Sequence, residues 1–223
     1  MRRVVTILLL ISSLMGILHA QEEPEQLKFR LLTANEYDLS LSISTVINRF
    51  YANVEFSVNP QQMGEADFYS FFITKMAYVE RIKINGKAVD FHYTRELDPR
   101  HFEPELEYPQ LLSPDADIYC ISLDQKHFDQ LDQPAVISID YKMVLPDWTM
   151  DNTGRQKIEW QSRDFFYPKN VLSTSRLNIT LLTTIFHSVE AADNVQDSGT
   201  MRKIYRSIVE YPALNATLTL YKG

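Results

Sequence analysis

Apolar and polar residues alternate with a period of two along most of this chain, from Tyr37 to Tyr221. Successive side chains of a β-strand point to opposite faces of a sheet, so this alternation predicts strands that pack one face on a core and turn the other to water. The clearest runs are Tyr37–Ser44 and Ala52–Asn59, separated by the polar Asn48 and Arg49. Together they predict a hairpin.

Further strands are predicted from three other kinds of signal. Phe68–Ile73 is aromatic and apolar except for Ser70, which suits a strand covered on both faces. Asn85-Gly86 favours a type I′ turn between the strand-like Val79–Ile84 and Ala88–Tyr93. The remaining predicted strands are Ile118–Leu123, Ala135–Met143, Gln156–Trp160, Phe165–Tyr167, Arg176–Leu181, Arg202–Ile208 and Asn215–Leu220.

Three stretches interrupt the alternation and are predicted to be loops. Glu96–Asp117 is acidic and carries four prolines, which remove backbone donors and indicate a long surface loop. Pro146–Gly154 is irregular and Asp193–Thr200 is polar. No segment has the pattern of an amphipathic helix longer than two turns. The fold class predicted is all-β, an antiparallel β-sandwich with long surface loops.

The N-terminus has the three parts of a secretion signal. Arg2 and Arg3 precede the apolar Val4–Leu18, and Ala20 provides a small residue at the cleavage site. We therefore expect residues 1–20 to be a signal peptide, with export to a periplasmic or extracellular location. Residues 21–36 are predicted to be a poorly ordered leader and residues 37–223 a single β-sandwich domain, without a further membrane span.

Composition limits the partners and the compartment. Removing Arg2 and Arg3 leaves 20 basic against 29 acidic residues, so the formal charge changes from −7 to −9 on maturation. An acidic surface argues against nucleic acid or an anionic membrane as partner, since both require clustered Lys and Arg. The single cysteine, Cys120, lies in a predicted strand and is expected to be a buried free thiol.

No set of residues with catalytic or metal-binding spacing stands out. His92, His101, His127, His187 and Cys120 are widely separated. The acidic loop Glu96–Asp117 could supply oxygen ligands for calcium. Calcium loops, however, have closely spaced ligands and a glycine at the turn, so we favour a solvated loop without a bound ion. Its polar groups are His101, Glu103, Glu105, Asp115 and Asp117. With no G-x-S-x-G elbow and six glycines in all, we predict no catalytic, cofactor-binding or metal-binding residues.

Aromatic residues gather towards the C-terminal half and allow two interpretations. Trp148, Trp160 and Phe165–Tyr167 could form an exposed platform for a sugar or a peptide, or they could pack in the core, which is the commoner use of such side chains. The pattern alone leaves both open.

Several segments resemble the N-terminal β-sandwich domain of the aminopeptidase N-like (gluzincin) zinc peptidases. Tyr37–Leu41 and Arg49–Phe56 are similar to that family's first hairpin, Tyr78–Val89 to its next hairpin, and Phe165–Pro168 to its aromatic-proline site. Ile137–Tyr141 resembles the strand before its irregular loop. The resemblance implies a saddle-like sandwich that normally packs against a neighbouring domain.

The family's zinc chemistry is not carried over to this sequence. No histidine has a Glu beside it, so the H-E-x-x-H helix is missing from residues 1–223. Glu159, Gln161 and Arg163 lie near the place where the family contributes a substrate-binding side chain, but their spacing does not match. We therefore assign them no function.

The sequence favours an exported, non-catalytic β-sandwich that binds or scaffolds another protein, or associates with itself. Two alternatives stay open. The chain could be the substrate-facing subunit of a split zinc aminopeptidase, or a carbohydrate- or peptide-binding module that uses the aromatic residues between 148 and 167.

Overall fold

The computed structural model describes residues 27–32, 34–44, 46–94, 98–102, 115–129, 131, 133–161, 166–169, 175–184, 187–189, 194–197, 202–211 and 217–222. The predicted signal peptide, residues 1–20, lies outside them. Strands make up most of the described chain. They are β1 (Phe29–Leu31), β2 (Glu36–Ser44), β3 (Arg49–Val58), β4 (Phe68–Thr74), β5 (Ala77–Ile84), β6 (Lys87–Val89), β7 (His92–Thr94), β8 (Ile118–Asp124), β9 (Ala135–Val144), β10 (Thr149–Met150), β11 (Gln156–Gln161), β12 (Ser175–Thr184), β13 (His187–Val189), β14 (Asn194–Asp197), β15 (Arg202–Tyr211) and β16 (Thr217–Lys222), with short helical turns α2 (Pro60–Met63), η1 (Pro99–His101) and η3 (Gln125–His127).

The strands form one large sheet and two small ones. The large sheet has the order β14-β15-β12-β2-β3-β9-β5-β6, and the small sheets have the orders β1-β4-β8-β7 and β10-β11-β16-β13. Pairing is antiparallel except for β1 with β4 and β2 with β12, which run parallel. The all-β sandwich predicted from the alternation is confirmed, with these two parallel pairs added.

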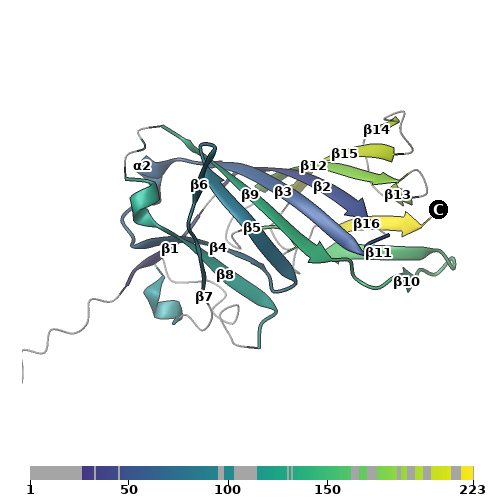
Figure 1. The fold of residues 1–223 in the computed structure, drawn as a ribbon, viewed down its shortest axis with the longest axis horizontal. Coiled ribbons are helices and arrows are strands. Elements are labelled where there is room, and N and C mark those ends of the chain that lie inside the picture. Colours follow the sequence, from purple (N-terminus) through teal and green to yellow (C-terminus); the bar gives the residue numbers. More distant parts are fainter. Residues whose placement is uncertain are drawn as a thin grey trace, which may run out of the picture.

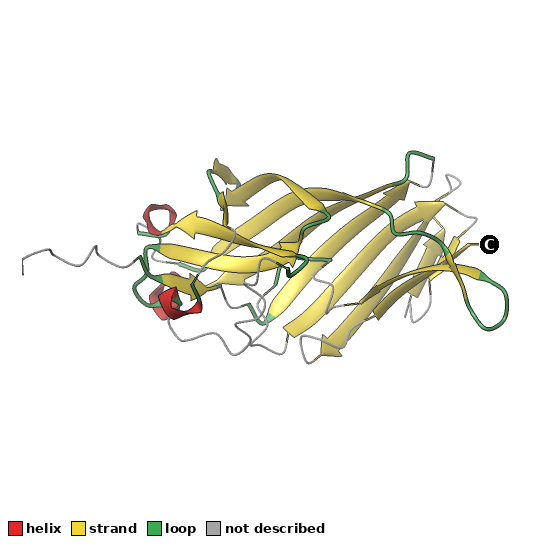
Figure 2. Ribbon diagram, turned by 90° about the horizontal axis from the view of Figure 1, so that it is seen from below, coloured by secondary structure: helices red, strands yellow, loops and turns green. Residues whose placement is uncertain are grey.

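Both small sheets pack on the same face of the large sheet, one at each end (Figure 1). At one end the ring of Phe56 meets Phe71 of β4 at 6.4 Å between centroids, and at the other Phe50 meets Trp160 of β11 at 5.3 Å. The inward side chains of β2, β3, β5, β9 and β12 join those of β4, β8 and β11 in a single apolar core. The short helical turns gather at the β1–β4–β8 end of the molecule (Figure 2).

The predicted hairpins are confirmed. Strands β2 and β3 pair antiparallel from Tyr37 opposite Phe56 to Ser44 opposite Arg49. Between β5 and β6, Asn85 has a φ of 50° and Gly86 a φ of 79°, the positive values that a type I′ turn requires. A Cβ on Gly86 would meet nothing within 4 Å, so glycine is needed there for its backbone freedom and not for space.

Strand β4 is buried on both faces, as its largely aromatic and apolar run predicted. One face joins the main core, and on the other Phe72 faces Phe102, whose ring lies 5.6 Å from that of Phe29. Most of the predicted loop over Glu96–Asp117 lies outside the described residues, but Phe102 at its start is buried here.

The prediction of a poorly ordered leader over residues 21–36 is wrong for its C-terminal part. Phe29–Leu31 forms β1, which runs parallel to β4, and Phe29, Leu32 and Ala34 are buried. The strand is only three residues long, so it has too few positions to show an alternating pattern. Its order comes from a partner almost forty residues later in the chain.

Three other local predictions need correction. The predicted strand Ala88–Tyr93 breaks after Val89, so that β6 joins the large sheet and β7 a small one. The predicted loop Asp193–Thr200 contains β14, an edge strand, where polar residues are expected. In place of the predicted strand Phe165–Tyr167, the described residues show an isolated bridge between Lys169 and Phe72.

No helix among the described residues has the length and apolar character needed to cross a bilayer. Cys120 is a buried free thiol in β8, as predicted.

Candidate functional site

The face of the large sheet that points away from the core is polar, and its side chains stand in rows across five strands. One row crosses the middle of the sheet, where Thr180 of β12, Ser40 of β2, Asn53 of β3, Asp140 of β9 and Arg81 of β5 are neighbours in register. The strands alternate buried and exposed positions, so the row results directly from the period-two pattern. We call this surface the outward face.

A β-bulge in β5 concentrates charge on the outward face. Val79 pairs with Tyr141 and Arg81 with Asp140, so Glu80 is an extra residue without a partner position. Glu80 and Arg81 are consecutive and both exposed, whereas regular alternation would bury one of them. Bulges commonly redirect side chains near binding sites.

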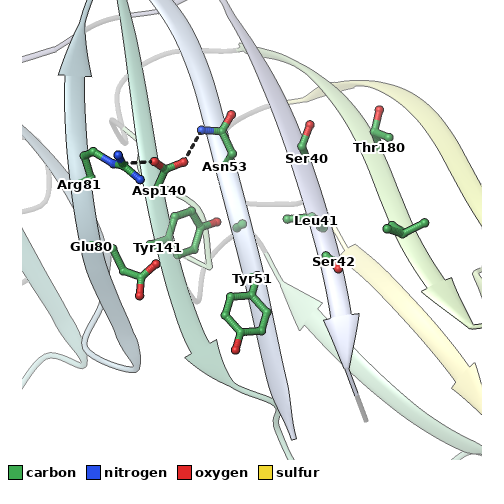
Figure 3. Close-up of a pocket in the computed structure, with 12 residues that line it drawn as sticks. Ser40, Leu41, Ser42, Tyr51, Asn53, Glu80, Arg81, Asp140, Tyr141 and Thr180 are labelled. Carbon is green, nitrogen blue, oxygen red and sulfur yellow. Dashed lines mark hydrogen bonds and ion pairs between the residues drawn. The ribbon is translucent and has the colours of Figure 1, made fainter. Parts of the chain in front are cut away.

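The charged groups beside the bulge are paired. The Asn53 amide donates to Ser138 Oγ at 2.9 Å and to Asp140 Oδ1 at 2.8 Å, while Arg81 Nε lies 3.2 Å from Asp140 Oδ2. Figure 3 shows Asn53, Asp140 and Arg81 joined in this way, with the amide oxygen of Asn53 turned away from Asp140.

Lys142 forms the second ion pair of the outward face. Its Nζ donates to Glu80 Oε1 at 2.5 Å and lies 5.0 Å from the centroid of the Tyr78 ring. The Glu80 hydrogen bond raises the pKa of Lys142, so this side chain is a cation at neutral pH. Both charged pairs at the bulge are therefore internally neutral.

A shallow depression of about 460 Å³ lies over this part of the outward face. Figure 3 shows the side chains around it, with the ring of Tyr51 at one side and the hydroxyls of Ser40, Ser42 and Thr180 on the neighbouring strands. Tyr51 is 40% exposed. We call this hollow the face depression. It contains hydrogen-bonding groups, two charges of each sign at its border, and one accessible aromatic ring.

The opposite end of the outward face is acidic. A second hollow of about 450 Å³ is lined by Glu36, Asp38 and Glu55 among others. Asn178 Nδ2 donates to Glu36 at 2.7 Å and to Asp38 at 2.8 Å, which ties two of these carboxylates together.

Exposed apolar side chains gather at the other end of the large sheet, where β3 begins and β9 ends. Val144 is opposite Arg49, next to the β2–β3 turn, and Ala77 at the start of β5 pairs with Met143. We call this group the turn-end rim. Its members, with their exposed fractions, are Val46 (93%), Ile47 (55%), Met76 (54%), Tyr78 (61%) and Val144 (42%).

The structure brings two of the sequence-separated histidines to one carboxylate. His92 Nε2 lies 3.6 Å and His127 Nε2 3.9 Å from Asp124 Oδ2, and Lys126 Nζ lies 2.8 Å from the same oxygen. The Lys126 hydrogen bond lowers the pKa of Asp124. Among the ranges that the structure describes, no group of three or more His, Cys, Asp or Glu is arranged to hold a metal ion.

The described metal-ligand candidates of the acidic loop and of β13 are not brought together. His101 stacks on Phe29 at 6.4 Å, and the side chain of His187 is not described. Glu103 and Glu105 lie outside the described residues, and Asp115 and Asp117 are in the turn before β8.

Most of the aromatic residues proposed as an exposed platform are in the core. Trp160, Phe166 and Tyr167 are at most 2% exposed, while Trp148 is partly buried against the core. Phe165 lies outside the described residues. Beside them Lys169 is also buried, with its Nζ 5.4 Å from the centroid of the Tyr167 ring. The interpretation as core packing is confirmed for Trp160, Phe166 and Tyr167, so these three rings do not form an exposed platform.

Of the three residues near the family's substrate-binding position, the structure describes Glu159 and Gln161. Glu159 is on β11, where its Oε2 accepts a hydrogen bond from Lys157 at 2.6 Å. Gln161 ends β11, and Arg163 lies outside the described residues.

Sequence reasoning missed the outward face as a candidate site. It treated Asn53 and Asp140 only as solvent-facing positions of an alternating pattern, and Tyr51 lies outside the predicted strand Ala52–Asn59. One signal was available. Glu80 and Arg81 are two consecutive charged residues in the middle of an alternating strand, which indicates a bulge.

Comparison with known proteins adds a fold relationship. No protein-family model matches the sequence, and no curated protein matches it either. Solved structures do match. Native yeast LTA4 hydrolase aligns with a TM-score of 0.59 and 13% identity, over 86% of this chain and 29% of the yeast protein. The M1 zinc metallopeptidase of Deinococcus radiodurans aligns with a TM-score of 0.56 and 13% identity, over 85% of this chain and 42% of that protein.

These matches confirm the resemblance noted in the sequence, at the level of the fold. The chain spans less than half the length of either protein. This chain therefore has the fold of the N-terminal β-sandwich domain of the M1-type zinc peptidases.

Proposed function

We propose that this chain is an exported, non-catalytic β-sandwich that binds another protein through the turn-end rim. The observation that supports this most is the grouping of Val46, Ile47, Met76, Tyr78 and Val144 at one end of the large sheet, each at least 42% exposed. Exposed apolar residues that are grouped at one place on the surface are typical of protein interaction sites.

Charge at the border of the rim supports the same proposal. Lys142 and Arg49 flank the apolar residues in register, and binding surfaces commonly combine an apolar centre with a polar border. An aromatic side chain such as Tyr78 can supply a large share of the binding energy.

Export is proposed from the charged start, the apolar Val4–Leu18 and the small residue Ala20. Mass spectrometry of the protein recovered from its native host would find a mature N-terminus at Gln21. A chain retained in the cytoplasm with residues 1–20 intact would contradict export.

Protein binding can be tested on the mature chain with a photo-crosslinking residue at position 47. We expect one discrete crosslinked product, either with a second copy of this chain or with a protein of the same compartment. Light scattering after size-exclusion chromatography would distinguish these two outcomes.

A matched pair of variants makes this test specific. Replacing Ile47→Ser and Val144→Ser together should abolish the complex, while Met150→Ser, at a 70% exposed apolar residue on β10, should leave it unchanged. A chain that stays monomeric and yields no discrete crosslink in extracts of its own compartment would overturn the proposal.

The structural matches favour one second candidate. The matched Deinococcus radiodurans protein is an M1 zinc metallopeptidase, so this chain could be the substrate-facing part of a peptidase whose zinc and base come from another polypeptide. A chain with an H-E-x-x-H helix, encoded nearby and lacking a sandwich of its own, should then copurify with it and show aminopeptidase activity only in the complex. Copurification without such activity would reject this candidate.

A further inference from the structure

We propose that the face depression binds a neutral, polyhydroxylated ligand, of which an oligosaccharide is the representative chemistry. This site adjoins the turn-end rim, because Lys142 pairs with Glu80 here and its Nζ also lies 5.0 Å from the ring of Tyr78. The proposed ligand does not depend on the protein-binding function. The site also differs from the platform considered in the sequence, because Trp160 and Tyr167 are buried whereas Tyr51 is accessible.

The charge arrangement favours a neutral ligand. Asp140 faces Arg81 at 3.2 Å, with Lys83 at 4.0 Å, and Glu80 faces Lys142 at 2.5 Å. Each carboxylate therefore has a cation beside it, and with Lys83 the cations outnumber the carboxylates by only one. A charged ligand would have to compete with these pairs, while a neutral one can hydrogen-bond to their remaining donors and acceptors.

The polar groups around the depression suit a ligand with many hydroxyls. The Asn53 amide uses both N–H groups on Ser138 and Asp140, which holds the amide rigidly and leaves its oxygen as an acceptor. The side chain of Arg81 is 57% exposed and offers further N–H donors. The hydroxyls of Ser40, Ser42 and Thr180 can both donate and accept.

The aromatic ring supplies the apolar contact that such a ligand needs. Tyr51 lies beside this row of polar groups and is 40% exposed. A sugar ring presents C–H groups on its faces and hydroxyls at its edge, so it can pack on a tyrosine ring and hydrogen-bond sideways at the same time. Ligand sites typically combine these two features.

Backbone pairing argues against an extended peptide at this place. The depression lies over β2, β3 and β9, whose backbone groups are already paired with strands on both sides. A peptide that adds a strand needs a free sheet edge, and the edges of the large sheet are β14 and β6. Recognition in the depression must therefore use side chains alone.

The experiment uses the mature chain on a glycan array that carries neutral oligosaccharides (cello-, malto-, xylo- and chito-series), anionic ones (polygalacturonate and heparin fragments) and a panel of peptides. Calorimetry then measures the strongest neutral hexasaccharide. We expect binding with a Kd between about 1 µM and 1 mM, within the ordinary range of single shallow sites.

Variants locate the site. Tyr51→Ala should weaken binding by about tenfold or more, as loss of an aromatic anchor does, while Tyr51→Trp keeps a ring and should retain it. Arg81→Gln tests the polar half of the depression without changing the tyrosine and should also weaken binding. Met150→Ala is the matched control on β10 and should bind as the unchanged chain does. Thermal unfolding verifies that each variant is folded.

Three outcomes would overturn the proposal. The first is the absence of any neutral glycan binding. The second is glycan binding by the folded Tyr51→Ala and Arg81→Gln variants that equals that of the unchanged chain. The third is binding confined to anionic glycans or to peptides. Neither Ile47 nor Val144 lines the depression, so failure here and failure of the protein-binding proposal give different results.

Discussion

At the scale of the single residue, the reactivity of Cys120 depends on its burial in the core. Its thiol is buried, lies 3.8 Å from the hydroxyl of Ser122, and has a pKa that burial raises to about 11. The nucleophilic form of cysteine is the thiolate. At pH 7 to 9, which is below this pKa, the folded protein therefore keeps Cys120 in the unreactive thiol form.

We predict that Cys120 does not react with a thiol reagent such as Ellman's reagent at pH 8 while the chain is folded, and that it reacts fully in denaturant. The measurement is the absorbance of the released chromophore over time. Rapid reaction of the folded chain would show that β8 is accessible and would contradict the burial of this strand.

The hydroxyls of Ser70 and Ser122 form a buried polar pair 2.8 Å apart between β4 and β8. Replacing Ser122→Ala removes the hydroxyl beside Ser70 and should lower the free energy of unfolding by about 1–3 kcal/mol, the usual cost of disrupting a buried hydrogen bond. Ser70→Ala should lower the free energy of unfolding by less in the Ser122→Ala variant than in the unchanged chain, because the two hydroxyls interact. Urea unfolding of both single variants and the double variant measures this, and strict additivity would contradict a direct contact.

At the scale of the element, the bulge in β5 can be removed to change the outward face while the core contacts of the strand are kept. Because Val79 pairs with Tyr141 and Arg81 with Asp140, deleting Glu80 leaves a regular strand whose alternation is intact. The core contacts of Val79 and Ile82 would be kept. The outward face would change, because the strand would lose the exposed carboxylate of Glu80 next to Arg81.

We predict that the Glu80 deletion folds with a stability within about 2 kcal/mol of the parent chain, a typical range for single changes, but loses glycan binding in the face depression. Glu80→Ala keeps the bulge and should retain more of the binding. Equal binding by the deletion and the parent chain would mean that the bulge does not shape the site.

Strand β1 gives a second prediction at this scale. A chain that begins at residue 35 lacks Phe29 and Leu32, whose burial is worth about 1.5–3 kcal/mol each. We expect it to lose several kcal/mol of stability in urea unfolding relative to a chain that begins at Leu27. Equal stability of the two chains would show that β1 adds little to the fold.

At the scale of the whole molecule, the sequence predicted the local elements better than their long-range arrangement. The hairpin from Tyr37 to Val58 and the Asn85-Gly86 turn have signals within a few residues, and both are confirmed. The parallel pairing of β2 with β12 joins Leu39 to Ile179, and nothing local encodes that choice of partner.

The candidate site was the least predictable part for a related reason. Ser40, Asn53 and Asp140 come from three segments and become neighbours only when the register of the large sheet is known. Each residue alone has the ordinary character of an exposed strand position. Their grouping is a property of the sheet and not of any one segment.

All of these proposals depend on a large sheet that buries one face and leaves the other open, and hydroxyl-radical footprinting with mass spectrometry tests that arrangement most directly. In the purified mature chain we predict fast oxidation of Tyr51, Met76 and Tyr78, and strong protection of Tyr141 and Trp160, which are at most 2% exposed. Protection of the first three, or fast oxidation of Tyr141 and Trp160, would contradict the account.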